Sequence, residues 1–174
     1  MNTYTVEKAL DILLRTPKAL FALLSDLDTA WVEQDEGPDT WTVKEVVAHL
    51  IVCEQTNWIP RSKIILAQNQ TSPFIPIDMT LHFQMAKDKT IAELLDEFQV
   101  LRNESIETLK AYDLQVNDML KTAIHPQLGT VSLSQLLATW VTHDLTHLAQ
   151  ITRILAKQNK PYVGPFNVFL RILK

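Results

Sequence analysis

Apolar residues recur at helical spacing along most of the chain, in four long segments. The first covers residues 6–15 and restarts at Thr16-Pro17, where a helix-capping residue precedes a proline suited to the first helical position. The others begin at Thr42, Thr90 and Ser132, each followed three residues later by Glu or Gln. That spacing is a capping box, in which two side chains satisfy free N–H groups at a helix start. The pattern therefore predicts four long helical segments.

The connections differ in length. The second segment extends to about residue 68, and Pro60 is expected to kink or interrupt it. Residues 69–89, with two prolines, predict a long crossover, and residues 112–131 predict a loop. The fourth segment ends near Asn159, and the tail after it is expected to add a short helix. We therefore predict an all-α four-helix bundle with one long crossover, built from residues 1–174 as a single domain.

Composition narrows the class of protein. Of 174 residues, 47% are hydrophobic and 21% charged, as in ordinary globular proteins, and only 3 are glycine, which disfavours turn-rich sheet folds. Lys and Arg number 16 against 20 Asp and Glu, so the net charge is −4 and no basic stripe suggests a nucleic-acid partner. The start of the chain lacks signal-peptide features and no apolar run could span a bilayer. We expect a cytoplasmic protein that binds neither nucleic acid nor membrane.

Histidine carries the candidate chemistry. His143 and His147 lie four residues apart in the fourth segment, so both rings can reach one ion. On a helical projection His147 falls inside the apolar arc and His143 at its edge, and His49 lies at the edge of the apolar arc of the second segment. Facing helices could bring the three rings together. A core-edge histidine is commonly satisfied by a neighbouring carbonyl or hydroxyl, so a purely structural role stays open.

Three neutral imidazoles would leave the charge of a divalent ion intact and at least one coordination position open, which is typical of a catalytic site. Such ligands suit Zn²⁺, Ni²⁺, Cu²⁺ or Fe²⁺, and of these we expect zinc or nickel. The metalloprotease pattern H-E-x-x-H is absent, because Asp144 follows His143. A single cysteine, Cys53, excludes an intramolecular disulfide and a Cys₂ or Cys₄ zinc site.

Three stretches of the chain resemble the DinB-like superfamily. They are WTVKEVVAHLIVCE (residues 41–54), TIAELLDEFQVLRNESIETL (90–109) and HPQLGTVSLSQLLATWVTHDLTHLAQITRIL (125–155). The last, with His143, Asp144, His147 and Gln150, is the most specific. The resemblance implies a four-helix bundle with a long crossover, whose metal site takes one histidine from the second helix and a pair from the last. Those positions match His49, His143 and His147.

The family includes thiol-dependent S-transferases, a mycothiol-dependent isomerase and many members described only as metal-dependent hydrolases. The resemblance implies a metal-dependent enzyme, and our leading hypothesis is a transferase that joins a low-molecular-weight thiol to a small electrophilic substrate. The alternatives are a hydrolase of an amide or ester, and a non-enzymatic stress or binding protein. Because family members commonly pair, we also expect a homodimer.

Several other residues were considered near this site. His125 could lie over the metal as a proton donor, but it and His82 fit surface turns better. Arg102 could bind a carboxylate of a substrate or thiol cofactor, or it could lie on a solvated helix face. Glu54 could be a general base if it turns inward. Cys53, one turn from His49, is expected to be a buried small side chain rather than a ligand. Asp144 is expected to pair with another helix or to support a ligand histidine.

Overall fold

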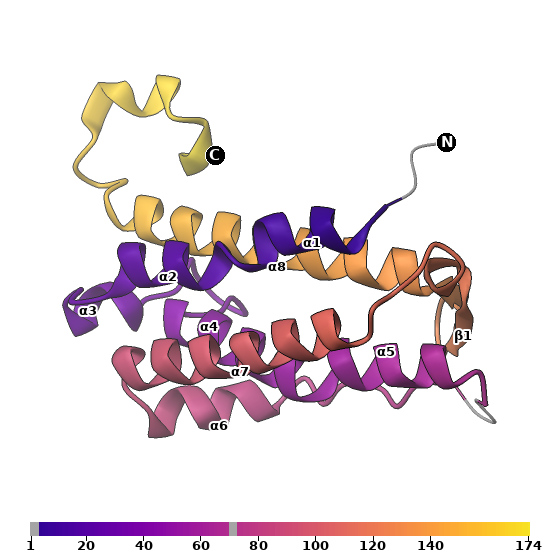
Figure 1. Ribbon diagram of the computed structural model, residues 1–174. Helices are drawn as coiled ribbons and strands as arrows, with labels where there is room; N and C mark the ends of the chain where they lie inside the picture. Colours follow the sequence, from indigo (N-terminus) through magenta and orange to yellow (C-terminus); the bar gives the residue numbers. More distant parts are fainter. Residues whose placement is uncertain (1–3, 70–72) are drawn as a thin grey trace.

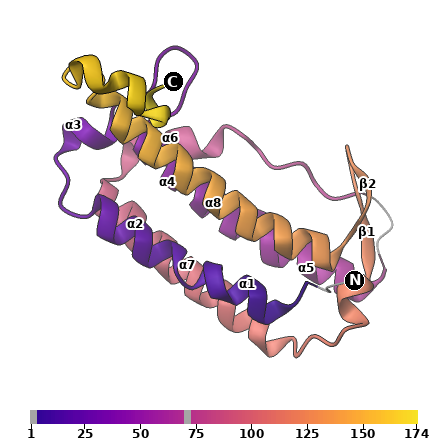
Figure 2. The same cartoon turned by 90° about the horizontal axis from the view of Figure 1, so that it is seen from above.

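The computed structural model describes residues 4–69 and 73–174, and four helical legs lie side by side in it (Figure 1). The first leg is α1 (Val6–Leu13) with α2 (Thr16–Leu24), and the second is α4 (Val43–Thr56) with α5 (Trp58–Ala67). The third is α7 (Ile91–Ala111), and the fourth is α8 (Leu133–Gln158). Figure 2 shows α1 and α2 lying along α7, with α8 lying over α4 and α5. The predicted four-helix bundle is confirmed.

The helix starts follow the local sequence. In each of three capping boxes, the cap hydroxyl accepts a hydrogen bond from the backbone N–H three residues on, and the Glu or Gln there accepts one from the cap N–H. These pairs are Thr42 with Glu45, Thr90 with Glu93, and Ser132 with Gln135. Pro17 lies in the first turn of α2. The sequence therefore located four helix starts, those of α2, α4, α7 and α8.

The second leg breaks before its proline. The helix ends at Thr56 and restarts at Trp58, with Asn57 at φ −108° and ψ −69°. Pro60 has no N–H to donate to the carbonyl of Thr56, and its ring would clash with that carbonyl in a regular helix. The group left without a partner is the carbonyl of Thr56, so the helix is interrupted about one turn before Pro60.

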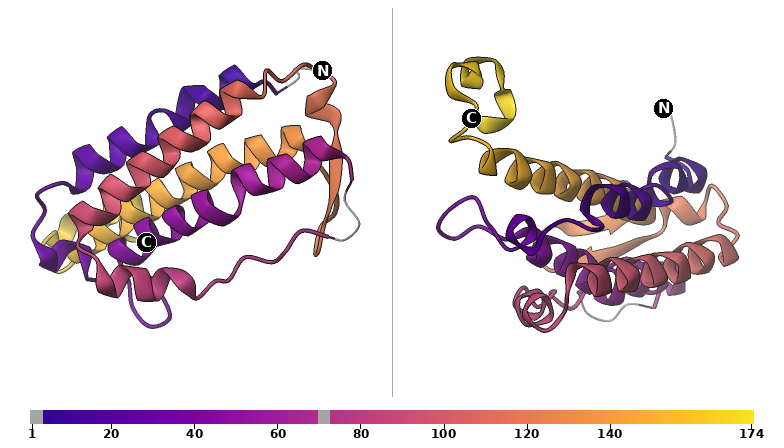
Figure 3. Two further views of the ribbon diagram at one scale, coloured as in Figure 1. Left: turned by 60° about the horizontal axis from the view of Figure 1, so that its bottom comes forward. Right: turned by 90° about the vertical axis from the view of Figure 1, so that its left-hand side faces the viewer.

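The connections hold more structure than expected. Within the crossover, residues 73–78 have no regular secondary structure, residues 79–80 form a turn, and a helix follows, α6 (Leu81–Asp88). Residues 70–72 lie outside the described part of the chain. Figure 3 shows this connection running beside the second leg. A four-residue helix, α3 (Thr29–Val32), joins the first two legs.

The expected loop at 112–131 is wrong in part, because it contains a 3-10 turn, η1 (Asp118–Leu120), and an antiparallel hairpin. Its strands are β1 (Thr122–His125) and β2 (Gly129–Ser132), and Gly129 takes a positive φ of 73° directly after the three-residue turn. A glycine at that place is a common hairpin signal. The backbone N–H of Phe74 donates to the carbonyl of Ile124, which ties the connection to the hairpin.

The core consists of two apolar clusters, and the histidines lie between them. On α4, Ala48 and Leu50 belong to one cluster and Cys53 to the other. On α8, Val141 belongs to the second cluster and Ile151 to the first. His49, His143 and His147 therefore lie where the two clusters meet, held by packed helices rather than by loops.

The chain after α8 forms two 3-10 helices, η2 (Gly164–Phe169) and η3 (Arg171–Leu173), at the end of the bundle (Figure 1, yellow). Leu173 is buried, whereas Tyr162, Phe166 and Phe169 are exposed. In the described part of the chain, every helix is too short or too polar to cross a membrane.

Candidate metal centre

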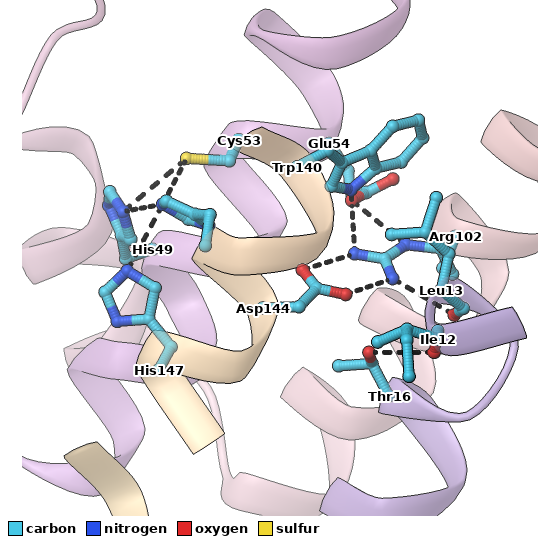
Figure 4. Close-up of polar contacts among 11 residues, drawn as sticks. Ile12, Leu13, Thr16, His49, Cys53, Glu54, Arg102, Trp140, Asp144 and His147 are labelled. Carbon is cyan, nitrogen blue, oxygen red and sulfur yellow. Dashed lines mark hydrogen bonds and ion pairs between the residues drawn. The ribbon is translucent and has the colours of Figure 1, made fainter. Parts of the chain in front are cut away.

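Three imidazole rings from two helices converge on one point. The Nε2 atom of His143 lies 3.1 Å from the Nε2 atom of His49 and 3.2 Å from that of His147. His49 comes from α4, and the other two come from successive turns of α8. Figure 4 shows His49, Cys53 and His147 in one cluster on one side of α8. The three rings lie beside one another, with centroids 5.2, 4.9 and 4.4 Å apart, while their binding of a metal stays a prediction.

These separations fit a shared cation. Two nitrogens bound to one zinc ion at about 2.0–2.1 Å stand about 3.3 Å apart at the tetrahedral angle. A hydrogen bond alone accounts for the contacts less well. The Nε2 atom of His143 faces two other ring nitrogens, and a single proton there can form only one well-aligned N–H···N bond. A cation beside the Nε2 atom of His143 would accept lone pairs from the neighbouring rings; among the described residues, the three ligand atoms that lie within 4.8 Å of one another come from His49, Cys53 and His143.

The electrostatics favour neutral rings. Burial, with the neighbouring His147 and His82, lowers the pKa of His49 to about 3. Burial, with His147, His49 and Arg102, lowers the pKa of His143 to about 3 as well. Burial also lowers the pKa of His147, against its hydrogen bond to Gln150 and the charge of Asp144, which raise it. Neutral imidazole is the form that binds a metal, so the site needs no deprotonation at neutral pH.

Gln150 sets the direction of one ligand. The Nδ1 atom of His147 lies 2.8 Å from the Oε1 atom of Gln150. An amide oxygen only accepts, so Nδ1 carries the proton and Nε2 presents its lone pair to the centre. Metal-binding histidines are commonly fixed in this way through their second nitrogen. The Nδ1 atom of His143, by contrast, is buried without a partner among the described residues.

Cys53 lies closer to the centre than the sequence suggested. Its sulfur is 3.5 Å from the Nε2 atom of His49 and 3.9 Å from that of His143. A sulfur and a nitrogen bound to one zinc ion stand about 3.5 Å apart, so these three residues could also share an ion. Burial, together with the charges of Glu54 and Asp144, raises the pKa of the thiol to about 12. The side chain is buried as expected, but it faces the ring nitrogens.

Aromatic rings enclose the centre. The Trp41 ring lies parallel to that of His147 at 6.2 Å between centroids, and Trp58 meets His143 edge-on at 5.1 Å. His82 was expected on the surface, and this was wrong. Its ring is fully buried, 4.3 Å from Trp41 and 5.6 Å from His49 between centroids, because it lies in the first turn of α6, which packs on α4.

A buried ion network lies on the other side of α8 (Figure 4). Arg102 on α7 is fully buried and donates to Glu54, to both oxygens of Asp144 and to the carbonyl of Leu13. The indole N–H of Trp140 donates to the same Glu54 oxygen at 3.2 Å. Arg102 therefore binds two carboxylates of the protein itself rather than a carboxylate of a substrate or thiol cofactor, and the suggestion of a solvated helix face is wrong. Glu54 is turned away from the histidines, whereas Asp144 pairs across helices as expected.

The arrangement has a simple origin in helix geometry. His143 and Asp144 are neighbours on α8, so their side chains point about 100° apart. One enters the histidine cluster and the other binds Arg102. On α4, Cys53 likewise contacts the histidine cluster, whereas the neighbouring Glu54 binds Arg102. The ion network therefore fixes the rotation of both helices that carry the histidines.

His125 stands apart from the centre. It lies at the end of β1, half-buried, and its Nδ1 atom accepts hydrogen bonds from the backbone N–H groups of Gln127 and Leu128. It lines a cavity with Arg61, a residue that the sequence analysis did not single out. Arg61 went unnoticed because it follows Pro60, where a helix break was expected. Gln150 belonged to the most specific stretch of the resemblance, but no role was assigned to it.

The fold and the histidine cluster together define a four-helix bundle with a candidate metal centre between its second and fourth legs. The family model described as the DinB superfamily matches residues 12–151. The chain belongs to this superfamily.

Two curated relatives carry the name "Putative metal-dependent hydrolase". One is from Bacillus cereus (strain B4264) and the other from Bacillus thuringiensis subsp. konkukian (strain 97-27). Each is 23% identical over 156 residues, which cover 82% of this chain and 81% of the relative.

Two solved structures are similar in fold. YfiT from Bacillus subtilis, described as a probable metal-dependent hydrolase with an unusual four-helix bundle topology, has a TM-score of 0.75 and 20% identity. The match covers 91% of this chain and 92% of that one. TT2238, a four-helix bundle protein, has a TM-score of 0.52 and 21% identity over 85% of this chain and 98% of its own.

Proposed function

We propose that this protein is a metal-dependent hydrolase whose divalent ion, zinc or nickel, is bound by the Nε2 atoms of His49, His143 and His147. The observation that carries the proposal is the pair of short Nε2–Nε2 separations, 3.1 and 3.2 Å, among three neutral rings. The relatives that share most of the chain's length are named for the same class of reaction.

The protein's own residues prepare the site. When bound, such an ion acts as a Lewis acid that makes a water or a thiol a stronger nucleophile at neutral pH. Gln150 orients His147, and the Arg102 network holds α4 and α8 in register. Trp41 and Trp58 restrict water around the rings, which strengthens electrostatic interactions within the site. None of the three ring ligands brings a negative charge, so the ion would keep its full charge.

A thiol-dependent transferase is the second candidate, and one observation favours it. The sulfur of Cys53 lies 3.5 Å and 3.9 Å from two of the ring nitrogens, so the site accommodates a sulfur atom at a ligand's distance. A thiol cosubstrate would need the same space, with Cys53 turned aside. If Cys53 itself holds that position permanently, the site is closed and a structural role follows, which is the non-enzymatic alternative.

The test separates the three functions. Zinc- and nickel-loaded protein is assayed with activated aryl esters alone, and with cysteine or glutathione plus a chlorodinitrobenzene electrophile. Metal-dependent ester turnover without a thiol, lost after chelation and in His147→Ala, supports the hydrolase. Turnover only with a thiol supports the transferase instead. Absence of both activities in a metal-loaded, folded protein contradicts both enzymes.

The same preparation is examined by size-exclusion chromatography with light scattering. A mass of two chains is the result expected for the homodimer, and a mass of one chain would contradict it.

A further inference from the structure

A polar stripe runs along the second leg, away from the histidine cluster. His49, Cys53, Asn57 and Arg61 follow one another at intervals of four residues, which places each beside the next on a helix. The first two belong to the candidate metal centre. The Oδ1 atom of Asn57 is buried and has no partner among the described residues. The stripe ends at the guanidinium of Arg61.

Arg61 is a buried charge with little to bind. Its residue is 8% exposed, and it lies over the ring of Phe74 at 5.0 Å. Within residues 4–69 and 73–174, the sole hydrogen bond of its guanidinium runs from Nη2 to the carbonyl of Ile75, 3.3 Å away, and no carboxylate pairs with it. Guanidinium has five N–H donors, and buried charges are normally paired because desolvation is costly. The remaining donors point to a ligand that is a negatively charged acceptor.

The side chain borders a cavity of about 270 Å³. One wall is the connection before α6, with Pro76, Ile77 and Met79, and the other is the hairpin turn, residues 125–127. Ligand sites of drug-like molecules begin at roughly 300 Å³, so this cavity suits a smaller one. Its lining is mainly apolar, with one permanent positive charge, and this combination matches a small organic monoanion.

The cavity and the candidate metal centre are linked along the second leg. Arg61 lies two helical turns after Cys53 on the same polar stripe, with Asn57 between them. The sulfur of Cys53 lies 3.5 Å from the Nε2 atom of His49. The guanidinium lies over the Phe74 ring and reaches the Ile75 carbonyl, so it forms the cavity end of the stripe.

We propose that this cavity is the substrate pocket of the metal centre and that Arg61 binds a carboxylate group of the substrate. The proposal rests on the function proposed above and adds to it a substrate class, a small carboxylic acid that also carries the reacting group. Arginine matches a carboxylate through two parallel N–H···O bonds, whereas the cavity offers no second cation for a phosphate dianion. The apolar lining would hold the hydrocarbon part.

Binding is measured first, by calorimetry with benzoate and with its neutral counterpart benzamide. The proteins are wild type, Arg61→Met, Arg61→Lys and the exposed control Arg15→Met, each with and without zinc. Metal-free protein is included because a carboxylate could also bind the ion directly. We expect wild type to prefer benzoate over benzamide by about tenfold or more without metal. Arg61→Met should lose this preference, Arg61→Lys should keep part of it, and Arg15→Met should leave it unchanged.

A merely structural role for Arg61 would alter stability but not the benzoate-to-benzamide ratio. Equal binding of the two probes by wild type overturns the proposal, as does a benzoate preference that survives in Arg61→Met or that exists only with zinc. Failure of wild type to bind either probe also overturns it.

Hydrolysis of 4-acetoxybenzoate and 4-acetoxybenzamide then separates this proposal from the function. If wild type binds benzoate through Arg61 but hydrolyses neither ester, the pocket stands and the hydrolase does not. If both esters are hydrolysed at equal kcat/KM without any benzoate preference, the hydrolase stands and the pocket does not.

Discussion

Replacing Arg102 by Met should destabilise the protein strongly, because it leaves two buried carboxylates without their counter-charge. The side chains of Glu54 and Asp144 are 1% and 0% exposed, and Arg102 joins them at 2.7 and 2.6 Å. Removing one partner of a buried ion pair typically costs about 3–5 kcal/mol. For a chain of this length, each kcal/mol lowers the melting temperature by about 2–4 °C, so we expect a fall of about 6–20 °C.

The assay is urea and thermal unfolding followed by circular dichroism on metal-free protein. Arg15→Met is the matched control: Arg15 pairs with Asp11 at 3.8 Å, and the two side chains are 68% and 76% exposed. A surface pair of this kind contributes about 0–1 kcal/mol. The variant that combines Arg102→Met with Glu54→Gln and Asp144→Asn should recover part of the loss, since no buried charge remains. Equal, small effects of the two single variants would refute the reasoning.

Three further predictions concern the histidine cluster. Gln150→Leu removes the acceptor that orients His147 and should weaken zinc binding about 10- to 100-fold in competition titrations with a chromogenic chelator; unchanged affinity would count against it. Cys53, with its pKa raised to about 12 from 9.0, should react with an aromatic disulfide reagent about 1,000-fold more slowly in the folded metal-free protein than in urea, and comparable rates would contradict this. The pKa values of His49 and His143 are lowered from 6.5 to about 3, so between these pH values the unfolded chain binds more protons than the folded protein. The stability of the metal-free protein should therefore be complete above about pH 6.5 and fall on acidification, by up to about 4 kcal/mol at pH 5 for the two rings. Urea unfolding above pH 6.5 and at pH 5 tests the direction of this change in stability. A protein as stable at pH 5 as above pH 6.5 would contradict the prediction.

The helical fold was predictable because its signals are local. Thr42, Thr90 and Ser132 lie at helix starts with their capping partners three residues away, so short sequence patterns located where α4, α7 and α8 begin. The pairing of His143 with His147 was predictable for the same reason, since four residues make about one helical turn. The contact of His49 with this pair could not be predicted from local sequence alone, because it depends on how the second and fourth legs face each other.

Longer-range features escaped because they depend on packing. His82 lies in a segment that looked like a loop, and its burial follows from α6 packing on α4. Arg102 lies on the buried stripe of α7 between Phe98 and Ser105, so its burial follows the helical period, but its pairing with Glu54 and Asp144 depends on how the helices pack. Arg61 could not be assigned, because its cavity forms from three segments distant in sequence.

The central claim, a divalent ion held by three histidines, is tested most directly by metal content. Untagged protein is dialysed against zinc or nickel, freed of excess ion and examined by mass spectrometry beside single alanine variants of His49, His143 and His147. His125→Ala is the control, because that ring lies outside the cluster. The account predicts about one ion per chain in wild type and in the control, and loss of the ion in the other three. A wild type that takes up no metal, or variants that retain it fully, would contradict the account.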